Sequence, residues 1–217
     1  MAMLYRADLA PSKVELLAAW LPTRAWFRGR DAAGLVRLDS YRFDDPDGQV
    51  GLETLIVRAA DGAVLHLPLT YRAGPLDGAD AWLLGTAEHS TLGPRWIYDA
   101  CGDPVYASVL ANVMFTGAGQ ADEFFEVDGE LERREVTTTV RGSGAGGGEA
   151  PAVRTVVRVD DTDPTVIHTD SLVLAVARVL AASPGRPAWG DGEPRASLAG
   201  TWAGQPDPRW LAEVRAG

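Results

Sequence analysis

The sequence holds one cysteine, one lysine and three histidines in 217 residues, and each scarcity excludes a class of site. A single cysteine, Cys101, allows no internal disulfide, no Cys-x-x-Cys redox pair and no cysteine-rich zinc site. His66, His89 and His168 have none of the spacings of a metal-binding helix or a zinc finger. Lys13 belongs to no G-x-x-x-x-G-K-[ST] motif that would bind nucleotide phosphates. We therefore expect neither a metal ion nor a cofactor.

Positive charge and long apolar runs are also scarce. Thirty acidic residues against twenty basic ones give a formal net charge of −10, which repels the phosphates of nucleic acids and anionic lipids. The longest apolar stretch, residues 171–182, is too short to span a bilayer and contains Arg178. Residues 1–13 contain no apolar run of signal-peptide length. The sequence predicts a cytoplasmic protein with neither nucleic acid nor membrane among its partners.

The first part of the chain has the pattern of a short helix followed by β-hairpins. Residues 10–22 predict the helix, with Ser12 and Glu15 as a capping box at its start. Pro22 ends it. Two runs rich in branched and aromatic residues follow, at 34–43 and 50–72. A turn signal at Asp45–Gly48 separates the two runs, and one at Asp61–Gly62 divides the second run into a hairpin. A helix across one face of an antiparallel meander would bury both apolar surfaces.

The rest of the chain predicts one further helix and several strands. Asp103 can cap the helix over 103–117, and Pro104 suits its first position. Strands are expected at 122–127, 133–142, 153–161, 171–180 and once more within the tail 195–217. We expect an α+β fold with a cap-like subdomain over 1–87 and a β-rich subdomain over 88–217. A glycine-rich loop near 142–148 belongs to the second subdomain.

That loop contains a G-x-G-x-x-G match at 142–147. A dinucleotide site needs these glycines between a strand and a helix, whereas here a proline and a β-rich run follow. The context favours a flexible hairpin loop or a seam between subdomains. Similarly, the acidic turn at 160–164 lacks the spacing of an EF-hand loop, so we expect a plain turn there.

Reactive residue types are densest in 88–106, "EHSTLGPRWIYDACGDPVY". A nucleophilic pair of Cys101 and His89 lacks a third group to orient the base, so we interpret Cys101 as a small buried apolar residue. Because His66 alternates with leucines in a predicted strand, we expect it on the less apolar face. We assign no catalytic residue. Four polar residues in this segment have no evident structural role and are the candidate binding residues: Glu88, His89, Arg95 and Asp99.

Residues 67–110, together with "LLAAWLPTRAWF" at 16–27, resemble the N-terminal region of actinobacterial maltokinases, which phosphorylate maltose with ATP in the pathway from trehalose to α-glucan (glycogen). The matching positions are Pro68 to Arg72, Leu76, Gly85-Thr86, Tyr98-Asp99-Ala100 and Asp103-Pro104. The resemblance implies a cystatin-like cap, a helix on an antiparallel sheet. A β-rich piece similar to part of a kinase N-lobe would follow it.

The resemblance extends into 157–180, where the kinases have a strand lysine that binds the nucleotide phosphates. Ala175 stands at that position here. Phosphoryl transfer depends on positioned charge, and no kinase-like catalytic loop or metal-binding motif occurs before Gly217. The resemblance therefore implies a non-catalytic module that binds a protein partner or a carbohydrate-related ligand in trehalose or glycogen metabolism.

Two alternatives remain open. The chain is a regulatory subunit of a separate sugar kinase or trehalose synthase, contacting it through a sheet edge or the glycine-rich loop; or it is an enzyme that uses the 88–101 segment. The tryptophans are consistent with partner or sugar binding if some are exposed. We expect Trp20, Trp26, Trp82 and Trp96 in the core. Trp189, Trp202 and Trp210 lie in glycine- and proline-rich surroundings and are the candidates for exposed stacking platforms.

Overall fold

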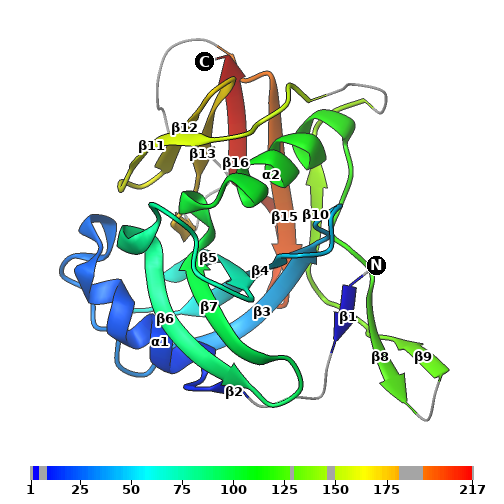
Figure 1. Ribbon diagram of the computed structural model, residues 1–217. Helices are drawn as coiled ribbons and strands as arrows, with labels where there is room; N and C mark the ends of the chain where they lie inside the picture. The colour runs from blue at the N-terminus through cyan, green and yellow to red at the C-terminus, as the bar shows by residue number, and fades with distance from the viewer. Residues whose placement is uncertain (1, 5–8, 128–129, 146–149, 181–192, 217) are drawn as a thin grey trace.

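The computed structural model describes residues 2–4, 9–127, 130–145, 150–180 and 193–216, which form an α+β fold with antiparallel sheets (Figure 1). A seven-stranded sheet runs in the order β2-β6-β7-β5-β4-β3, with β14 also paired to β5. Its strands are β2 Leu9–Ala10, β3 Val36–Phe43, β4 Gly51–Arg58, β5 Val64–Arg72, β6 Leu83–His89, β7 Gly93–Asp99 and β14 Val179–Leu180. This sheet contains both predicted hairpins of the first part of the chain.

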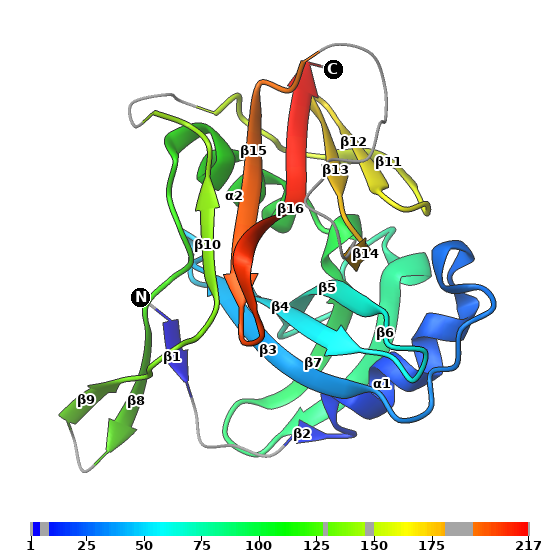
Figure 2. The same ribbon diagram turned by 180° about the vertical axis from the view of Figure 1, so that it is seen from behind.

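A six-stranded sheet in the order β10-β15-β16-β13-β12-β11 forms the second layer. Its strands are β10 Thr139–Gly142, β11 Val156–Asp160, β12 Thr165–Thr169, β13 Leu172–Val176, β15 Ala196–Trp202 and β16 Gln205–Ala216. A small sheet projects from the body (Figures 1 and 2) and consists of β1 Ala2–Leu4, β8 Glu123–Val127 and β9 Glu130–Arg133.

The two α-helices begin where the sequence predicts them. In α1, Lys13–Trp20, the Ser12 hydroxyl accepts from the Glu15 backbone N–H at 3.3 Å, and the Glu15 carboxylate accepts from that of Ser12 at 2.8 Å. In α2, Pro104–Thr116, the Asp103 carboxylate caps the first turn. Short 3₁₀ turns lie at Leu21–Thr23, Ala25–Phe27, Asp80–Trp82 and Ala100–Gly102.

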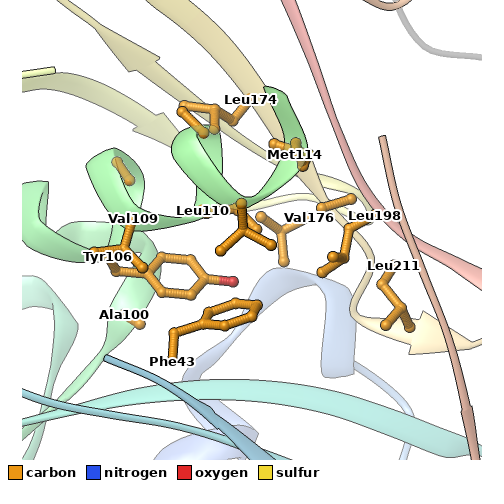
Figure 3. Packing of buried hydrophobic residues seen from close by; sticks show 14 of the residues in the cluster. Phe43, Ala100, Tyr106, Val109, Leu110, Met114, Leu174, Val176, Leu198 and Leu211 are labelled. Carbon is orange, nitrogen blue, oxygen red and sulfur yellow. The ribbon is translucent and has the colours of Figure 1, made fainter. Parts of the chain in front are cut away.

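The seven-stranded sheet is covered on both faces. On one face α1 and the turns after it pack on an apolar cluster that includes Leu17, Leu55 and Leu67. On the other face, α2 and the six-stranded sheet share a second cluster (Figure 3), in which Phe43 of β3 lies near Tyr106 and Leu110 of α2. Because both faces are covered, β4 and β5 are buried along almost their whole length.

His66 lies on the face of β5 opposite its leucine neighbours, as the alternation predicts, because Leu65 and Leu67 face the cluster under α1. That opposite face meets the six-stranded sheet, so His66 is fully buried there.

Three strand predictions differ from the structure. Within 133–142, Arg133 ends β9 and only Thr139–Gly142 form a further strand, β10. The run 171–180 is not one strand: β13 ends at Val176, and after Ala177 and Arg178 the chain joins the seven-stranded sheet as β14 (Figure 2). The tail forms a hairpin of two long strands, β15 and β16, where one strand was expected. Periodicity detects extended chain but does not show which sheet a strand joins.

The glycine-rich segment does not close a hairpin either. β10 and β11 lie at opposite edges of the six-stranded sheet, so the connection between them crosses the sheet. Residues 146–149 lie outside the described part of the chain. A Cβ on Gly142 would lie 2.1 Å from the Val113 carbonyl oxygen, and one on Gly144 1.9 Å from that of Phe115. These glycines therefore permit close packing against the C-terminal end of α2.

The predicted boundary between residues 87 and 88 lies within β6, which pairs with β7 on both sides of that point. Across the described ranges, neither α1 nor α2 is long and apolar enough to cross a membrane.

Candidate functional site

Asp99, one of the four predicted binding residues, lies in a buried junction between the two sheets. Its carboxylate accepts from Arg178 Nη2 at 2.6 Å, and both side chains are 1% exposed. Arg178 also donates from Nε to Thr165 Oγ1 at 2.7 Å, and its guanidinium lies over the Trp26 ring. A buried carboxylate needs such a partner, because an unpaired charge in the interior is strongly unfavourable. Asp99 is therefore closed to solvent and serves to join the two sheets.

His66 and Cys101 lie in the same interior. His66 Nδ1 donates to the Ala177 carbonyl oxygen at 3.0 Å, which leaves Nε2 to accept from the Tyr41 hydroxyl at 2.8 Å. Burial lowers the pKa of His66 to about 4 and raises that of the Cys101 thiol well above its usual value. Both side chains are thus held neutral and structural, as expected for Cys101.

The other three predicted binding residues lie on the hairpin of β6 and β7. His89 pairs in register with Gly93 at the start of β7, whereas Asp99 is the last residue of that strand. An extended strand rises about 3.3 Å per residue, so Gly93 and Asp99 are about 20 Å apart. The proposed pair of His89 and Cys101 is separated in the same way. Glu88 is exposed, and Arg95 is half-buried with Nη1 donating to the Pro94 carbonyl oxygen. Burial, followed by repulsion from Arg95, Lys13 and Arg42, lowers the pKa of His89.

A feature that the sequence did not reveal is the outer edge of β11. This strand ends the order of the six-stranded sheet, with β12 as its strand neighbour among the described residues. The register shifts between Val156 and Arg158, so that the pairing skips Val157. The Val157 side chain is 70% exposed, an unusual position for a valine. Arg154 and Arg158 flank it on the same segment.

A cleft of about 280 Å³ runs beside this edge. It is lined by the segment Arg154 to Val159, by Leu76 and Trp82 of the connection between β5 and β6, and by Pro104 at the start of α2. Trp82 is held in place because its ring lies on Gly102, where a Cβ would come within 2.3 Å of it. A strand edge facing apolar side chains can bind an extended peptide through main-chain hydrogen bonds.

A larger cavity, about 470 Å³, lies between the β3–β4 turn and α2. Much of its wall is alanine, glycine and proline. The Gln120 amide in it already bonds to the Thr138 carbonyl oxygen and the Val140 N–H. It offers a ligand no cationic side chain and no aromatic face except that of buried Phe43. The β11 cleft is therefore the better candidate for binding.

The remaining predicted residues have structural surroundings. Ala175 is buried in β13 between Val166 and Glu213 of the neighbouring strands. The acidic turn is a plain turn, as predicted, in which the Asp163 carboxylate accepts from the Arg178 N–H at 2.9 Å. Where the structure describes the chain, no three His, Cys, Asp or Glu side chains are grouped to hold a metal ion.

The prediction of exposed tryptophans is wrong for Trp202, which packs in the core at one end of β15. Trp210 is half-buried, and Trp189 lies outside the described residues. Trp20 is buried as expected, while the other three expected in the core, Trp26, Trp82 and Trp96, are half-buried. None of the six tryptophans described is a fully exposed platform for stacking.

The seven-stranded sheet with its α1 helix is the arrangement expected for a maltokinase cap, and comparison with known families agrees. Residues 20–103 match the maltokinase N-terminal cap domain. The matched residues contain β3 to β7 and the buried Asp99, whereas the partner of Asp99, Arg178, lies outside them.

No curated protein matches the chain at a significant level. Five chains among the solved structures do. One is a glucosamine kinase in complex with glucosamine, ADP and inorganic phosphate, 22% identical with a TM-score of 0.49. The alignment covers 95% of this chain and 41% of the kinase, so this chain spans less than half of that protein's length.

Proposed function

We propose that the protein is a non-catalytic module of the maltokinase cap type that binds a protein partner by strand addition at β11. The observation that carries the proposal is the outer edge of β11, where a 70% exposed valine borders a cleft that Trp82 also lines. Exposed apolar side chains on a strand edge are unfavourable in a monomer and are normally covered or replaced by charge. A partner strand would cover Val157 and pair with the main chain.

The partner that suits this protein is a sugar kinase or an enzyme of trehalose or glycogen metabolism. The match to a maltokinase domain supports that pathway. The flanking Arg154 and Arg158 favour an extended segment with acidic side chains. Arg158 is already paired with Asp160 at 3.1 Å, so we expect Arg154 to attract an acidic partner segment more strongly than Arg158 does.

A matched pair of variants tests the edge. Val157→Asp places a charge on β11, and Val36→Asp makes the same change on β3, the edge strand of the other sheet, where the valine is 46% exposed. Tagged protein is used to capture partners from its host, and captured proteins are identified by mass spectrometry. We expect a sugar kinase or trehalose or glycogen enzyme with wild type and Val36→Asp, and its loss with Val157→Asp. Equal recovery with both variants would exclude β11 as the docking edge.

Binding of a neutral sugar is the alternative to strand addition, and it can be tested with the same purified protein. Since the described tryptophans include no exposed platform, titration with maltose, trehalose or a maltooligosaccharide is expected to leave tryptophan fluorescence unchanged. A saturable change at millimolar sugar would favour a carbohydrate ligand over a partner strand.

Absence of kinase activity belongs to the same proposal. With Ala175 at the position of the phosphate-binding lysine, the chain alone should transfer no phosphate from ATP to maltose. Turnover above background that is lost on purification to homogeneity would point to a co-purifying kinase; turnover that persists would contradict a non-catalytic role.

A further inference from the structure

Cationic side chains gather on the face of the seven-stranded sheet that α1 covers, beside the start of that helix. At their centre Glu53 of β4, 3% exposed, accepts from Lys13 Nζ at 2.5 Å and from the Tyr71 hydroxyl at 2.8 Å. Arg42 Nη2 approaches the same carboxylate oxygen at 3.4 Å. Exposed Arg37 donates to Ser40 and contributes to the potential at Lys13 and Tyr71.

The cluster continues to the β6–β7 hairpin. Arg95 pairs in register with Ala87, which packs in the apolar cluster under α1, so Arg95 lies on the same face of the sheet. Arg95, Lys13 and Arg42 all lower the pKa of His89, the other residue predicted from the sequence on this hairpin. We call Lys13, Arg37, Arg42 and Arg95 the cap-face cations.

Among the described residues, Glu53 is the carboxylate that pairs with the cap-face cations, and its single negative charge is smaller than their combined positive charge. Burial raises the pKa of Glu53, but Arg42 and Lys13 together lower it to about 2, so the carboxylate is fully ionised. Glu123 also acts on Arg42, but it has its own ion pair with Arg134 at 2.7 Å. Burial lowers the pKa of Lys13, and repulsion from Arg42 and Arg37 lowers it further, against the attraction of Glu53.

This concentration of positive charge occurs in a chain with a net charge of −10 and a single lysine, Lys13. Like charges held together on a half-buried surface repel one another, and an added anion relieves that repulsion. Guanidinium and ammonium groups are the donors that proteins use for phosphate. We propose that the cap-face cations form a binding site for a dianionic phosphate group, free or carried by a sugar.

The site does not depend on strand addition at β11, and it is tested on the full chain with inorganic phosphate and glucose 1-phosphate. Binding is measured by calorimetry and by the melting temperature, at neutral pH and at ionic strength held constant with chloride. We expect saturable binding and a raised melting temperature. Tighter binding of glucose 1-phosphate would identify a sugar phosphate as the ligand, and equal binding would identify the phosphate group alone.

Variants locate the site. Arg42→Gln removes a charge-assisted hydrogen bond and should weaken phosphate binding about tenfold, whereas Arg28→Gln, at an exposed arginine outside the cluster, should not. Arg37→Gln is the surface variant to use if Arg42→Gln does not fold. Glu53→Gln removes the competing negative charge and should tighten binding. The proposal is overturned if phosphate has no effect beyond that of chloride, or if all four variants respond as wild type does.

Discussion

Arg178 is the residue on which the contact between the two sheets depends most. Its guanidinium neutralises Asp99 and its main chain bonds to both Asp163 and His66. Removing one partner of a buried ion pair leaves the other uncompensated, at a cost of about 3–5 kcal/mol. Arg178→Ala is therefore expected to lower the free energy of unfolding by that amount in urea, followed by tryptophan fluorescence.

Two comparisons make the test specific. Arg178→Met with Asp99→Leu removes both charges and should recover much of the lost stability. Arg133→Ala breaks the exposed pair with Asp122 and should change stability by less than about 1 kcal/mol. If Arg178→Ala were as mild as Arg133→Ala, the buried pair would not hold the sheets together.

His66 gives the protein a pH dependence of known sign. Its pKa is about 4 when folded, below its ordinary value of 6.5, so the unfolded chain binds a proton first as the pH falls. The stability that neutral His66 provides is complete above about pH 6.5 and falls by about 3 kcal/mol as the pH approaches 4.

The measurement is the difference in unfolding free energy between wild type and His66→Gln across this range. Carboxylates titrate in both proteins and cancel in the difference. The advantage of wild type should shrink as the pH falls through the window; a difference independent of pH would show that folding does not lower the pKa of the imidazole.

At the scale of elements, the sequence predicted the starts of the helices but not the pairing of strands distant in sequence. Ser12 and Glu15 cap α1, and Asp103 with Pro104 starts α2, because caps involve only neighbouring residues. The departure of the chain from β13 to β14 depends instead on Asp99, which lies 79 residues earlier. No pattern within 171–180 can show it.

The candidate site follows the same rule. The sequence pointed to Arg95, which is one of the cap-face cations, and to His89, whose pKa these cations lower, but the centre of that cluster, Glu53, lies within an apolar strand. The exposure of Val157 results from a register shift against β12. Both features require knowledge of the pairing of strands distant in sequence.

The packing of the glycine-rich segment on α2 gives a prediction for an element. Gly142→Ala would bring a Cβ within 2.1 Å of the Val113 carbonyl oxygen, and such overpacking costs about 1–3 kcal/mol. Gly74→Ala is the matched control, because nothing lies within 4 Å of its added Cβ. Thermal unfolding should show a lower melting temperature for Gly142→Ala alone. A neutral result would mean that the segment does not pack on the helix in solution.

At the scale of the whole molecule, we expect the two sheets to unfold as one cooperative unit, because they share an apolar cluster. The residues that match the cap domain, 20–103, include one face of the sheet that α2 and the six-stranded sheet cover. A fragment of residues 1–103 would expose Tyr41, Leu52 and Ile56 to water. We expect it to aggregate or to bind a hydrophobic dye, whereas the full chain should unfold in one transition by circular dichroism and fluorescence.

The opposite result is simple to recognise. A monomeric fragment of residues 1–103 that unfolds cooperatively and binds no dye would show that the cap is stable without the second sheet.

The two residues of β14 also limit how such proteins can be recombined. β14 pairs with Val64 and Leu65 of β5, and the residue before it supplies the guanidinium for Asp99. A chimera that transferred residues 20–103 alone into another protein would leave both behind. Exchange of caps between relatives, in the laboratory or in evolution, must therefore carry residues 177–180 with it or replace Asp99 with a neutral side chain.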